Sequence, residues 1–501
     1  MSEINNDIPI DEPSPSKPSH SPGKESLKAT ALKASMWSMG GFALGNFLRL
    51  VSNLILAYLL VDNIGALGLM ALVTAFLQGL RMFSDMGLNL GVVQHKDGAK
   101  QEFVRTAWTL QAVRGVVLYA ACWLLAYPFA VFYDEPILMH LIPITGVITL
   151  VNGFASSGMI LAKRNLDVKK LTFIELGTQI AGLVVMMVWA FQSPTVWALV
   201  AGNVTGAVFR TVISHIVFFE KSVWFGWNKA AAVTLLKFGG WIFLATILTF
   251  LSTQIDKLAF GKVFDVWALG IFGVAATFAM VPTQAVMKLG NQVVFPAYAK
   301  VVNRGDDLSS VLDRVREPVL VAAGLAASGM FAAGPWLVKS LYPVPYVAAG
   351  WMLQLLAVGM LMRVLSETSK AALLSVGQSK AVAIGQAMKI VCFAALAPIG
   401  YTTLGMMGFV AALSLSECGR YASMAVLAER KGLHVLPRDA AACWLTVAAS
   451  SIGMYAGDLS AAMLSPGRAQ AALGLVVASG VSGVFWVPAL LRSYRALRSR
   501  S

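Results

Sequence analysis

Apolar segments of about twenty residues recur along almost the whole chain and constrain its fold more than any other feature. A segment of this length spans the ~30 Å hydrocarbon core of a bilayer as an α-helix. The composition agrees, because 57% of the 501 residues are hydrophobic and only 13% are charged, which is not the balance of a soluble globular protein. We therefore expect an all-α, polytopic membrane protein with about fourteen transmembrane helices.

The predicted spans fall into two sets of six and a final pair. The first set is Ala34–Leu60, Ile64–Phe83, Thr106–Ala130, Ile137–Ala162, Leu171–Ala190 and Val196–Phe219. The second set is Gly239–Phe260, Ala268–Val286, Pro318–Val338, Trp351–Leu374, Ala381–Gly400 and Leu404–Leu427. The final pair is Ala440–Ala456 and Ala469–Leu491.

The distribution of basic residues predicts the orientation of these spans. An even number of spans places both termini on one side of the membrane. The terminal segments and the loops on their side hold twenty-six Lys and Arg residues, whereas the opposite loops hold three. By the positive-inside rule both termini are cytoplasmic. The net charge of +14 then reflects topology and contact with anionic lipid, and we expect no nucleic-acid partner.

An internal repeat suggests that the helices form two lobes. Leu56–Phe76 matches Leu258–Phe278 at seven of twenty-one positions, including an Ala-Leu-Gly triplet in each copy. Six predicted spans separate the copies, so both face the same way across the membrane. Two six-helix lobes with parallel orientation are typical of transporters whose halves rock around a site between them.

The domain boundaries follow from this repeat and from local composition. The first thirty residues are rich in Pro and Ser and lack large hydrophobic side chains, which predicts a disordered tail. The predicted parts are therefore a disordered cytoplasmic tail at 1–30, an N-lobe at 31–219, an interfacial cytoplasmic linker at 220–237, a C-lobe at 238–430, and two helices with a basic C-terminus at 431–501.

Several motifs occur in the order found in one family of transporters. They read LILAYLLVDNIGALGLMALV, FSDMGLNLGVVQHKD, LAKRNLDVKKLTFIE, TQIDKLAFGKVFDVWALGIFGVA and QVVFPAYAKVV. Between Ala34 and Leu427 the chain thus resembles Wzx-type polysaccharide flippases. One departure is Lys257, where the family pattern usually has Arg. The ammonium group of Lys is a point charge and lacks the planar guanidinium that binds phosphate through two hydrogen bonds.

The resemblance has consequences for fold, substrate and location. It implies the fold of the multidrug/oligosaccharidyl-lipid/polysaccharide (MOP) exporter superfamily and a place in the bacterial inner membrane. It also implies an oligosaccharide substrate on an undecaprenyl pyrophosphate carrier, turned towards the periplasm for exopolysaccharide, capsule or O-antigen assembly. Membrane lipids, and polymerase and export proteins of a polysaccharide pathway, are the partners it suggests.

Cations within the spans provide a second indication of the substrate. Ten Lys and Arg residues lie outside both sets of loops, against four acidic residues in the spans. This excess suits a pyrophosphate, because Arg binds phosphate oxygens through two parallel hydrogen bonds. Arg49, Arg210 and Arg363 lie ~18–22 Å inside their spans and need a polar cavity, whereas snorkelling equally explains cations nearer the helix ends. The candidate substrate-binding residues are Arg49, Arg81, Arg114, Arg210, Arg363 and Arg420.

Five further charged residues form a candidate gate or ion-coupling set: Asp256, Lys257, Glu367, Lys370 and Glu417. Arg363, Glu367 and Lys370 share a helix face, and Glu417 lies three residues before Arg420, so local ion pairs are expected. These pairs either pack the lobes together or line a cavity whose acids carry a coupling proton. Asp256 lies ~25 Å from the cytoplasmic start of its span, which places it and Lys257 at a periplasmic rim or gate.

The sequence offers little support for catalysis or for a cofactor. The four Cys have no CxxC spacing, the five His are scattered, and no P-loop occurs, so we expect no metal, no cofactor and no ATPase. Two other functions remain open. A cation-coupled drug antiporter would prefer an acidic cavity, and a membrane polymerase or ligase would need larger outer loops than the roughly dozen residues found here.

Overall fold

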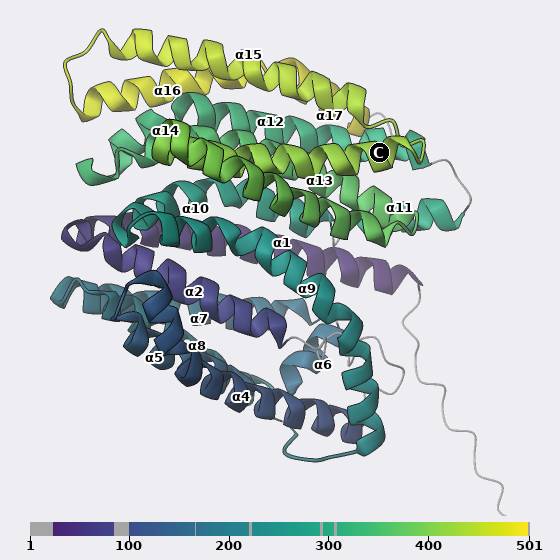
Figure 1. Cartoon of the computed structure of the whole chain (residues 1–501). Coiled ribbons are helices and arrows are strands. Elements are labelled where there is room, and N and C mark those ends of the chain that lie inside the picture. The colour runs from purple at the N-terminus through teal and green to yellow at the C-terminus, as the bar shows by residue number, and fades with distance from the viewer. Residues whose placement is uncertain are drawn as a thin grey trace, which may run out of the picture.

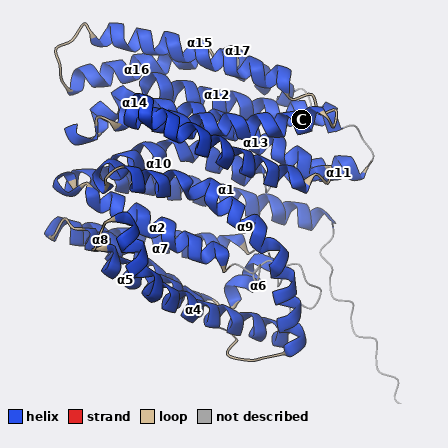
Figure 2. Ribbon diagram, in the orientation of Figure 1, coloured by secondary structure: helices blue, strands red, loops and turns tan. Residues whose placement is uncertain are grey.

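The computed structural model describes residues 24–84, 100–165, 167–219, 223–290, 294–304 and 308–498. Within these ranges the chain forms helices and short connections and no strand (Figure 1, Figure 2). The predicted all-α class is therefore confirmed. Ten of the described helices are long and apolar enough to cross a membrane, or eleven if one bent pair counts as a single span. The count of fourteen stays a prediction.

The N-terminal half begins with a helix that is longer than predicted. Its elements are α1 (Lys24–Leu59), the short turn η1 (Val61–Asn63), α2 (Gly65–Phe83), α4 (Gln101–Tyr133), α5 (Leu138–Gly153), α6 (Gly158–Arg164), α7 (Val168–Gln192) and α8 (Val196–Val217). The helix α1 starts before the predicted Ala34, because good helix formers follow Pro22 and Gly23. It thus includes the last residues of the predicted tail, while residues 1–23 lie outside the described part.

The predicted span Ile137–Ala162 is not one straight helix. The chain bends by 66° between α5 and α6. Serine side chains replace the missing helical hydrogen bonds at the bend: the Ser156 backbone N–H donates to the Ser214 hydroxyl at 3.0 Å, and the Gly158 N–H donates to the Ser156 hydroxyl at 3.1 Å. The bend positions α6 beside the ends of α4 and α8.

The C-terminal half also starts earlier than expected. Its elements are α9 (Lys229–Val263), α10 (Val266–Leu289), α11 (Phe295–Asn303), α12 (Leu308–Leu341), the turn η4 (Val344–Tyr346), α13 (Ala349–Ser375), α14 (Ser379–Glu429), α15 (Leu436–Ala461), α16 (Arg468–Val484) and α17 (Val487–Arg498). The side chain of Asn228 caps α9 by accepting from the Ala231 N–H at 3.1 Å. Residues 229–237, predicted as linker, are therefore the first turns of α9.

The helix α14 reverses its direction near its middle. Gly405 has a φ of 58°, which glycine adopts without the strain that a Cβ would cause. After the reversal Gly408 returns to Gly400 so closely that a Cβ on Gly400 would lie 2.4 Å from the Gly408 carbonyl oxygen. The two arms of α14 correspond to the predicted spans Ala381–Gly400 and Leu404–Leu427.

The two copies of the repeat meet where α2 crosses α10. A Cβ on Gly68 would lie 1.9 Å from the Val266 carbonyl oxygen, and a Cβ on Gly270 would lie 2.5 Å from the Ile64 carbonyl oxygen. Gly68 and Gly270 are the last residues of the two Ala-Leu-Gly triplets, and Ile64 and Val266 are also equivalent positions. The contact is thus reciprocal, as a two-fold relation between the copies requires; the division into two six-helix lobes stays a prediction.

A shared hydrophobic core joins the two halves at one end of the bundle. It contains Leu60, Tyr133, Phe260, Tyr346 and Phe409, which lie near the connections after α1, α4, α9 and α12 and near the reversal of α14. At the other end, where α1 begins and α17 ends (Figure 1), separate clusters form within single halves. The largest core cluster thus joins the halves at this end, while at the other end smaller contacts link them, such as the cluster of Phe103, Ala107, Ile160 and Ala231 between α4, α6 and α9.

Candidate functional site

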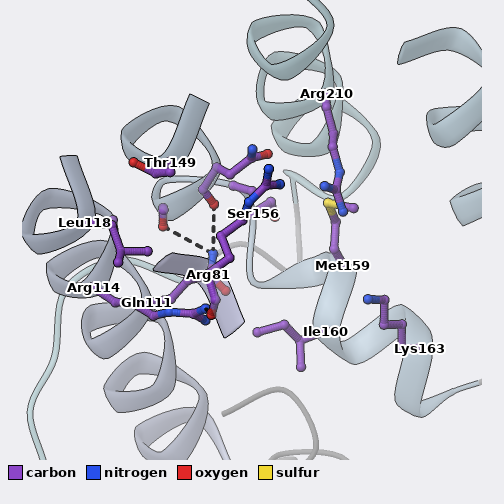
Figure 3. Close-up of a pocket in the computed structure, with 14 residues that line it drawn as sticks. Arg81, Gln111, Arg114, Leu118, Thr149, Ser156, Met159, Ile160, Lys163 and Arg210 are labelled. Atoms are coloured by element: carbon purple, nitrogen blue, oxygen red, sulfur yellow. Dashed lines mark hydrogen bonds between the residues drawn. The ribbon is translucent and has the colours of Figure 1, made fainter. Parts of the chain in front are cut away.

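Four cations surround a cavity in the N-terminal half. This cavity, called here the N-half pocket, has a volume of about 190 Å³ and lies between α2, α4, α5, α6 and α8. Arg81 of α2, Arg114 of α4, Lys163 of α6 and Arg210 of α8 all line it (Figure 3). No Asp or Glu is among its lining residues in the described part of the chain. Three of the six candidate substrate-binding residues, Arg81, Arg114 and Arg210, thus line one cavity. Their role in substrate binding stays a prediction.

Arg114 fixes the end of α2 at this pocket. Its Nε donates to the Ser84 hydroxyl at 2.8 Å, and its Nη2 donates to the Arg81 carbonyl at 2.7 Å. A cation at this position suits the carbonyls that a helix leaves unpaired at its C-terminus. Gln111, one turn earlier on α4, donates to the Gly153 carbonyl at 3.2 Å and thereby ties α4 to α5. Arg114 therefore has a positioning role as well as a charge.

Arg210 enters the pocket from α8. The adjacent Thr211 donates its hydroxyl to the Val151 carbonyl at 3.1 Å, which holds α8 against α5. The Nε of Arg210 is buried and has no hydrogen-bond partner within the described part of the chain. A buried donor without an acceptor costs about 1–3 kcal/mol, and more when it is charged. Arg210 therefore brings to the wall of the N-half pocket a charged side chain with an unsatisfied donor.

The C-terminal half holds a second group of charges, which is arranged differently. Glu417 on α14 accepts from Arg363 of α13 through Nε at 2.9 Å and Nη2 at 2.5 Å. Lys389 lies 2.8 Å from the same carboxylate, and Arg420 lies 3.5 Å from its other oxygen. The Glu417 side chain is only 4% exposed. Three cations thus enclose one buried carboxylate.

A second carboxylate completes this arrangement. Glu367 of α13 pairs with Lys370 one turn away and with Arg420 of α14. The expected pairing within helices is present for Glu367–Lys370 and Glu417–Arg420, while Arg363 pairs across to α14 instead. The group is called here the C-half network and comprises Arg363, Glu367, Lys370, Lys389, Glu417 and Arg420.

The C-half network is connected to α9. Lys389 donates to the Ser252 carbonyl at 2.5 Å, and the Ser252 hydroxyl contacts Gln386. Asp256, one turn further along α9, lines a cavity of about 50 Å³ together with Arg363, Lys389 and Glu417. Its Oδ1 is buried without a hydrogen-bond partner among the described residues. Asp256 thus lies in a cavity wall because α9 packs along α14, and its predicted place at a periplasmic rim or gate stays a prediction.

The other predicted residues are placed apart from these two groups. Lys257 is half-buried, and its side chain has no hydrogen bond or ion pair within the described ranges. Arg49 lines a third cavity with Lys288 and Glu175. The three arginines predicted to lie deepest, Arg49, Arg210 and Arg363, therefore line three separate cavities. Nowhere in the described ranges do three or more His, Cys, Asp or Glu residues come together so as to hold a metal ion.

Comparison with known proteins identifies the family. The profile of a family described as "Polysaccharide biosynthesis protein" matches residues 55–343, which is more than half of the chain. The chain belongs to this family. This confirms the resemblance found in its sequence motifs.

One relative of this family member is the "Lipopolysaccharide biosynthesis protein WzxC" of Escherichia coli (strain K12). It is 23% identical over 279 residues, which cover 55% of this chain and 56% of the relative. The match thus spans little more than half of the relative's length.

Solved structures show that the fold is the one expected of the MOP superfamily. The structure "Lipid II flippase MurJ, inward closed conformation" matches with a TM-score of 0.66 at 12% identity, over 91% of this chain and 98% of that chain. An inward-facing multidrug resistance MATE family transporter of the MOP superfamily matches with a TM-score of 0.59 at 14% identity, over 79% of this chain and 95% of that chain. At these identities the likeness concerns the fold.

Sequence reasoning missed one buried ion pair in this polysaccharide biosynthesis family member. Arg316 and Asp439 were assigned to cytoplasmic loops, but their side chains are 3% and 1% exposed. The Nη2 of Arg316 lies 3.0 and 2.9 Å from the two carboxylate oxygens of Asp439, and Tyr421 donates its hydroxyl to the same carboxylate at 2.8 Å. No local pattern distinguishes these residues from their charged neighbours, because 123 positions separate them.

Proposed function

We propose that this protein moves undecaprenyl pyrophosphate-linked oligosaccharide repeat units from the cytoplasmic to the periplasmic leaflet of a bacterial inner membrane by alternating access. The observation that carries the proposal is the N-half pocket, which four cations line, with no Asp or Glu among its described lining residues. A pyrophosphate presents only acceptor oxygens, and Arg210 has a buried donor that lacks an acceptor. The membership of a polysaccharide biosynthesis family supports the same substrate class.

The shape of the molecule supports a cytoplasmic site of entry. Arg81 and Lys163 stand in the last turns of α2 and α6, at helix ends that the Lys/Arg distribution assigns to the cytoplasm. The shared core joins the halves at the opposite, periplasmic end. In this conformation the N-half pocket receives a head group from the cytoplasmic leaflet, and separation of the halves at the periplasmic end releases it. Both termini are then cytoplasmic.

The C-half network has a separate role in this proposal. Its cations are already paired with Glu367 and Glu417, so they attract a phosphate less strongly than the cations of the N-half pocket do. Asp256 faces the same charges from α9, the helix that connects the two halves, and its Oδ1 has no partner among the described residues. Its carboxylate lies in the same cavity wall as Arg363 and Lys389 and attracts both. We assign the C-half network to helix packing and Asp256 to the gate or ion-coupling step. Lys257, the next residue, forms no hydrogen bond or ion pair within the described ranges that supports either role.

A gene deletion tests this function. We expect loss of an extracellular polysaccharide and accumulation of lipid-linked repeat units accessible only from the cytoplasm. Restoration of the polysaccharide by the wild-type gene is the control. Normal polysaccharide with increased drug sensitivity would instead support a drug antiporter. Loss of polymer with repeat units exposed to the periplasm would support a polymerase or ligase and contradict the assignment as a transporter rather than an enzyme.

Cysteine labelling tests the proposed topology. In a chain whose native cysteines are replaced, single cysteines at Asn165 and Arg438 should resist a membrane-impermeant thiol reagent added outside intact cells. A cysteine at Ser460, at the opposite end of α15 from Arg438, should react. Permeabilised cells provide the control that all three positions are reactive. Labelling of position 165 in intact cells would overturn the orientation.

A further inference from the structure

A third cavity in the fold has a different chemistry from the N-half pocket. It has a volume of about 380 Å³ and lies between α1, α7 and α10. Its lining combines charged side chains, namely Arg49, Lys288 and Glu175, with the amides of Asn46, Gln179 and Gln284. This α1–α7–α10 cavity shares no lining residue with the N-half pocket. It is therefore a separate candidate site.

Asn46 provides an unpaired acceptor in this cavity. The residue is only 7% exposed, and its Nδ2 donates to the Phe42 carbonyl at 2.9 Å. Its Oδ1 is buried without a hydrogen-bond partner among the described residues. Glu175 adds a carboxylate to the same lining, which is also purely an acceptor when ionised. A ligand that satisfies these groups must carry hydrogen-bond donors.

Arg49 provides the complementary charge. It stands one turn after Asn46 on α1, and its side chain forms no hydrogen bond or ion pair within the described part of the protein. Lys288 is already engaged, because its Nζ donates to the Ser38 carbonyl at 2.5 Å and lies 4.9 Å from the centre of the Phe42 ring. One guanidinium thus remains to bind one anionic group.

These features disfavour a second pyrophosphate site. A pyrophosphate carries only acceptors when fully ionised, so it would face the unpaired oxygen of Asn46 and the carboxylate of Glu175 without satisfying either. A sugar acid has hydroxyl groups that donate to such acceptors and one carboxylate that Arg49 binds through its fork. We propose that the α1–α7–α10 cavity binds an acidic sugar, a hexuronate, in the repeat unit of the transported oligosaccharide. This proposal rests on the proposed transport function.

Calorimetry on the purified full-length chain in lipid nanodiscs tests this site. The probes are a hexuronate disaccharide, its neutral carboxyl-reduced counterpart, and inorganic pyrophosphate. We expect the hexuronate disaccharide to bind more tightly than the neutral disaccharide. Its affinity should be the same with and without saturating pyrophosphate. Arg49→Gln should weaken hexuronate binding about ten- to a hundred-fold and leave pyrophosphate binding unchanged. The matched variant Arg210→Gln should weaken pyrophosphate binding and leave hexuronate binding unchanged.

A second variant makes the test independent of Arg49. Gln284→Glu adds a carboxylate to the α10 wall of the cavity and should weaken hexuronate binding while the neutral disaccharide is unaffected. Equal binding of the acidic and neutral disaccharides, or no binding of either, would overturn the proposal. Displacement of the hexuronate by pyrophosphate would also overturn it and assign the cavity to the carrier head group. If any of these results is found while pyrophosphate still binds and that binding depends on Arg210, only the hexuronate proposal is overturned and the proposed transport function is still supported.

Discussion

The N-half pocket and the C-half network contain the same kinds of cation but differ in their acids. Arg81, Arg114, Lys163 and Arg210 surround a cavity that no described Asp or Glu lines, whereas each arginine of the C-half network contacts a buried carboxylate. The cations that line the N-half pocket can attract an anion, and the cations paired with Glu367 and Glu417 already stabilise helix packing. The presence of an arginine in a membrane span is therefore a weaker indicator of substrate binding than the absence of a nearby carboxylate.

The largest effect that this comparison predicts is on stability. Glu417→Gln leaves Arg363 and Lys389 buried without their shared counter-charge, and removal of one partner from a buried pair costs about 3–5 kcal/mol. We expect little folded protein in the membrane, measured by fluorescence-detected size exclusion of a tagged chain. The matched control is Glu175→Gln, which removes a carboxylate without a recorded ion pair. Wild-type amounts of folded Glu417→Gln protein would contradict the packing role of the network.

A substitution of Arg114 should have a smaller effect on stability and should also affect transport. Its hydrogen bonds to Ser84 and to the Arg81 carbonyl hold the end of α2, so Arg114→Gln should reduce the free energy of unfolding by about 1.5–3 kcal/mol. Transport per folded molecule should also fall, because Arg81 is no longer held in place. Thermal unfolding midpoints and transport assays on the same preparation measure both quantities. An unchanged midpoint would show that Arg114 has no positioning role.

The smallest effect is expected at Lys163, whose side chain is exposed at the rim of the N-half pocket. Exposed charges contribute about 0.2–1 kcal/mol and are screened by salt. Lys163→Gln should therefore weaken pyrophosphate binding only about two- to five-fold at low ionic strength, with no difference at about 1 M salt. Titration at the two salt concentrations measures this. A large loss of pyrophosphate affinity at both salt concentrations would contradict this prediction, because it would show that Lys163 binds the ligand as a buried residue does.

Part of this account could be read from the sequence, and the repeat is the clearest example. The two Ala-Leu-Gly triplets were visible as a pattern, and the structure brings Gly68 and Gly270 to the same helix crossing. The membrane helices and three cations of the N-half pocket, Arg81, Arg114 and Arg210, could also be noticed in the sequence, because charges in apolar segments are rare. Lys163 could not, because it stands among the basic residues of a predicted loop.

The rest depends on contacts between distant residues. Arg363 and Glu417 are 54 positions apart, so no local spacing indicates that the arginine is neutralised. The Arg316–Asp439 pair was hidden among charged neighbours for the same reason. The bend between α5 and α6 depends on the Ser214 hydroxyl, which comes from another helix. The sequence did not indicate that Asp256 shares a cavity with Arg363 and Glu417, because its distance along one helix does not reveal which neighbours that helix packs against.

The most direct test of the difference between the two groups compares Arg210→Ala with Arg363→Ala. Transport per molecule is measured with the amount of folded protein quantified in the same cells. Arg210→Ala should keep a wild-type amount of protein and lose transport about ten- to a hundred-fold, the effect of losing a charge-assisted contact of about 1.5–3 kcal/mol. Arg210→Lys should retain part of the activity. Arg363→Ala should reduce the amount of folded protein, with the remaining molecules transporting at the wild-type rate. Normal transport per molecule in Arg210→Ala would contradict the assignment of the N-half pocket to the substrate.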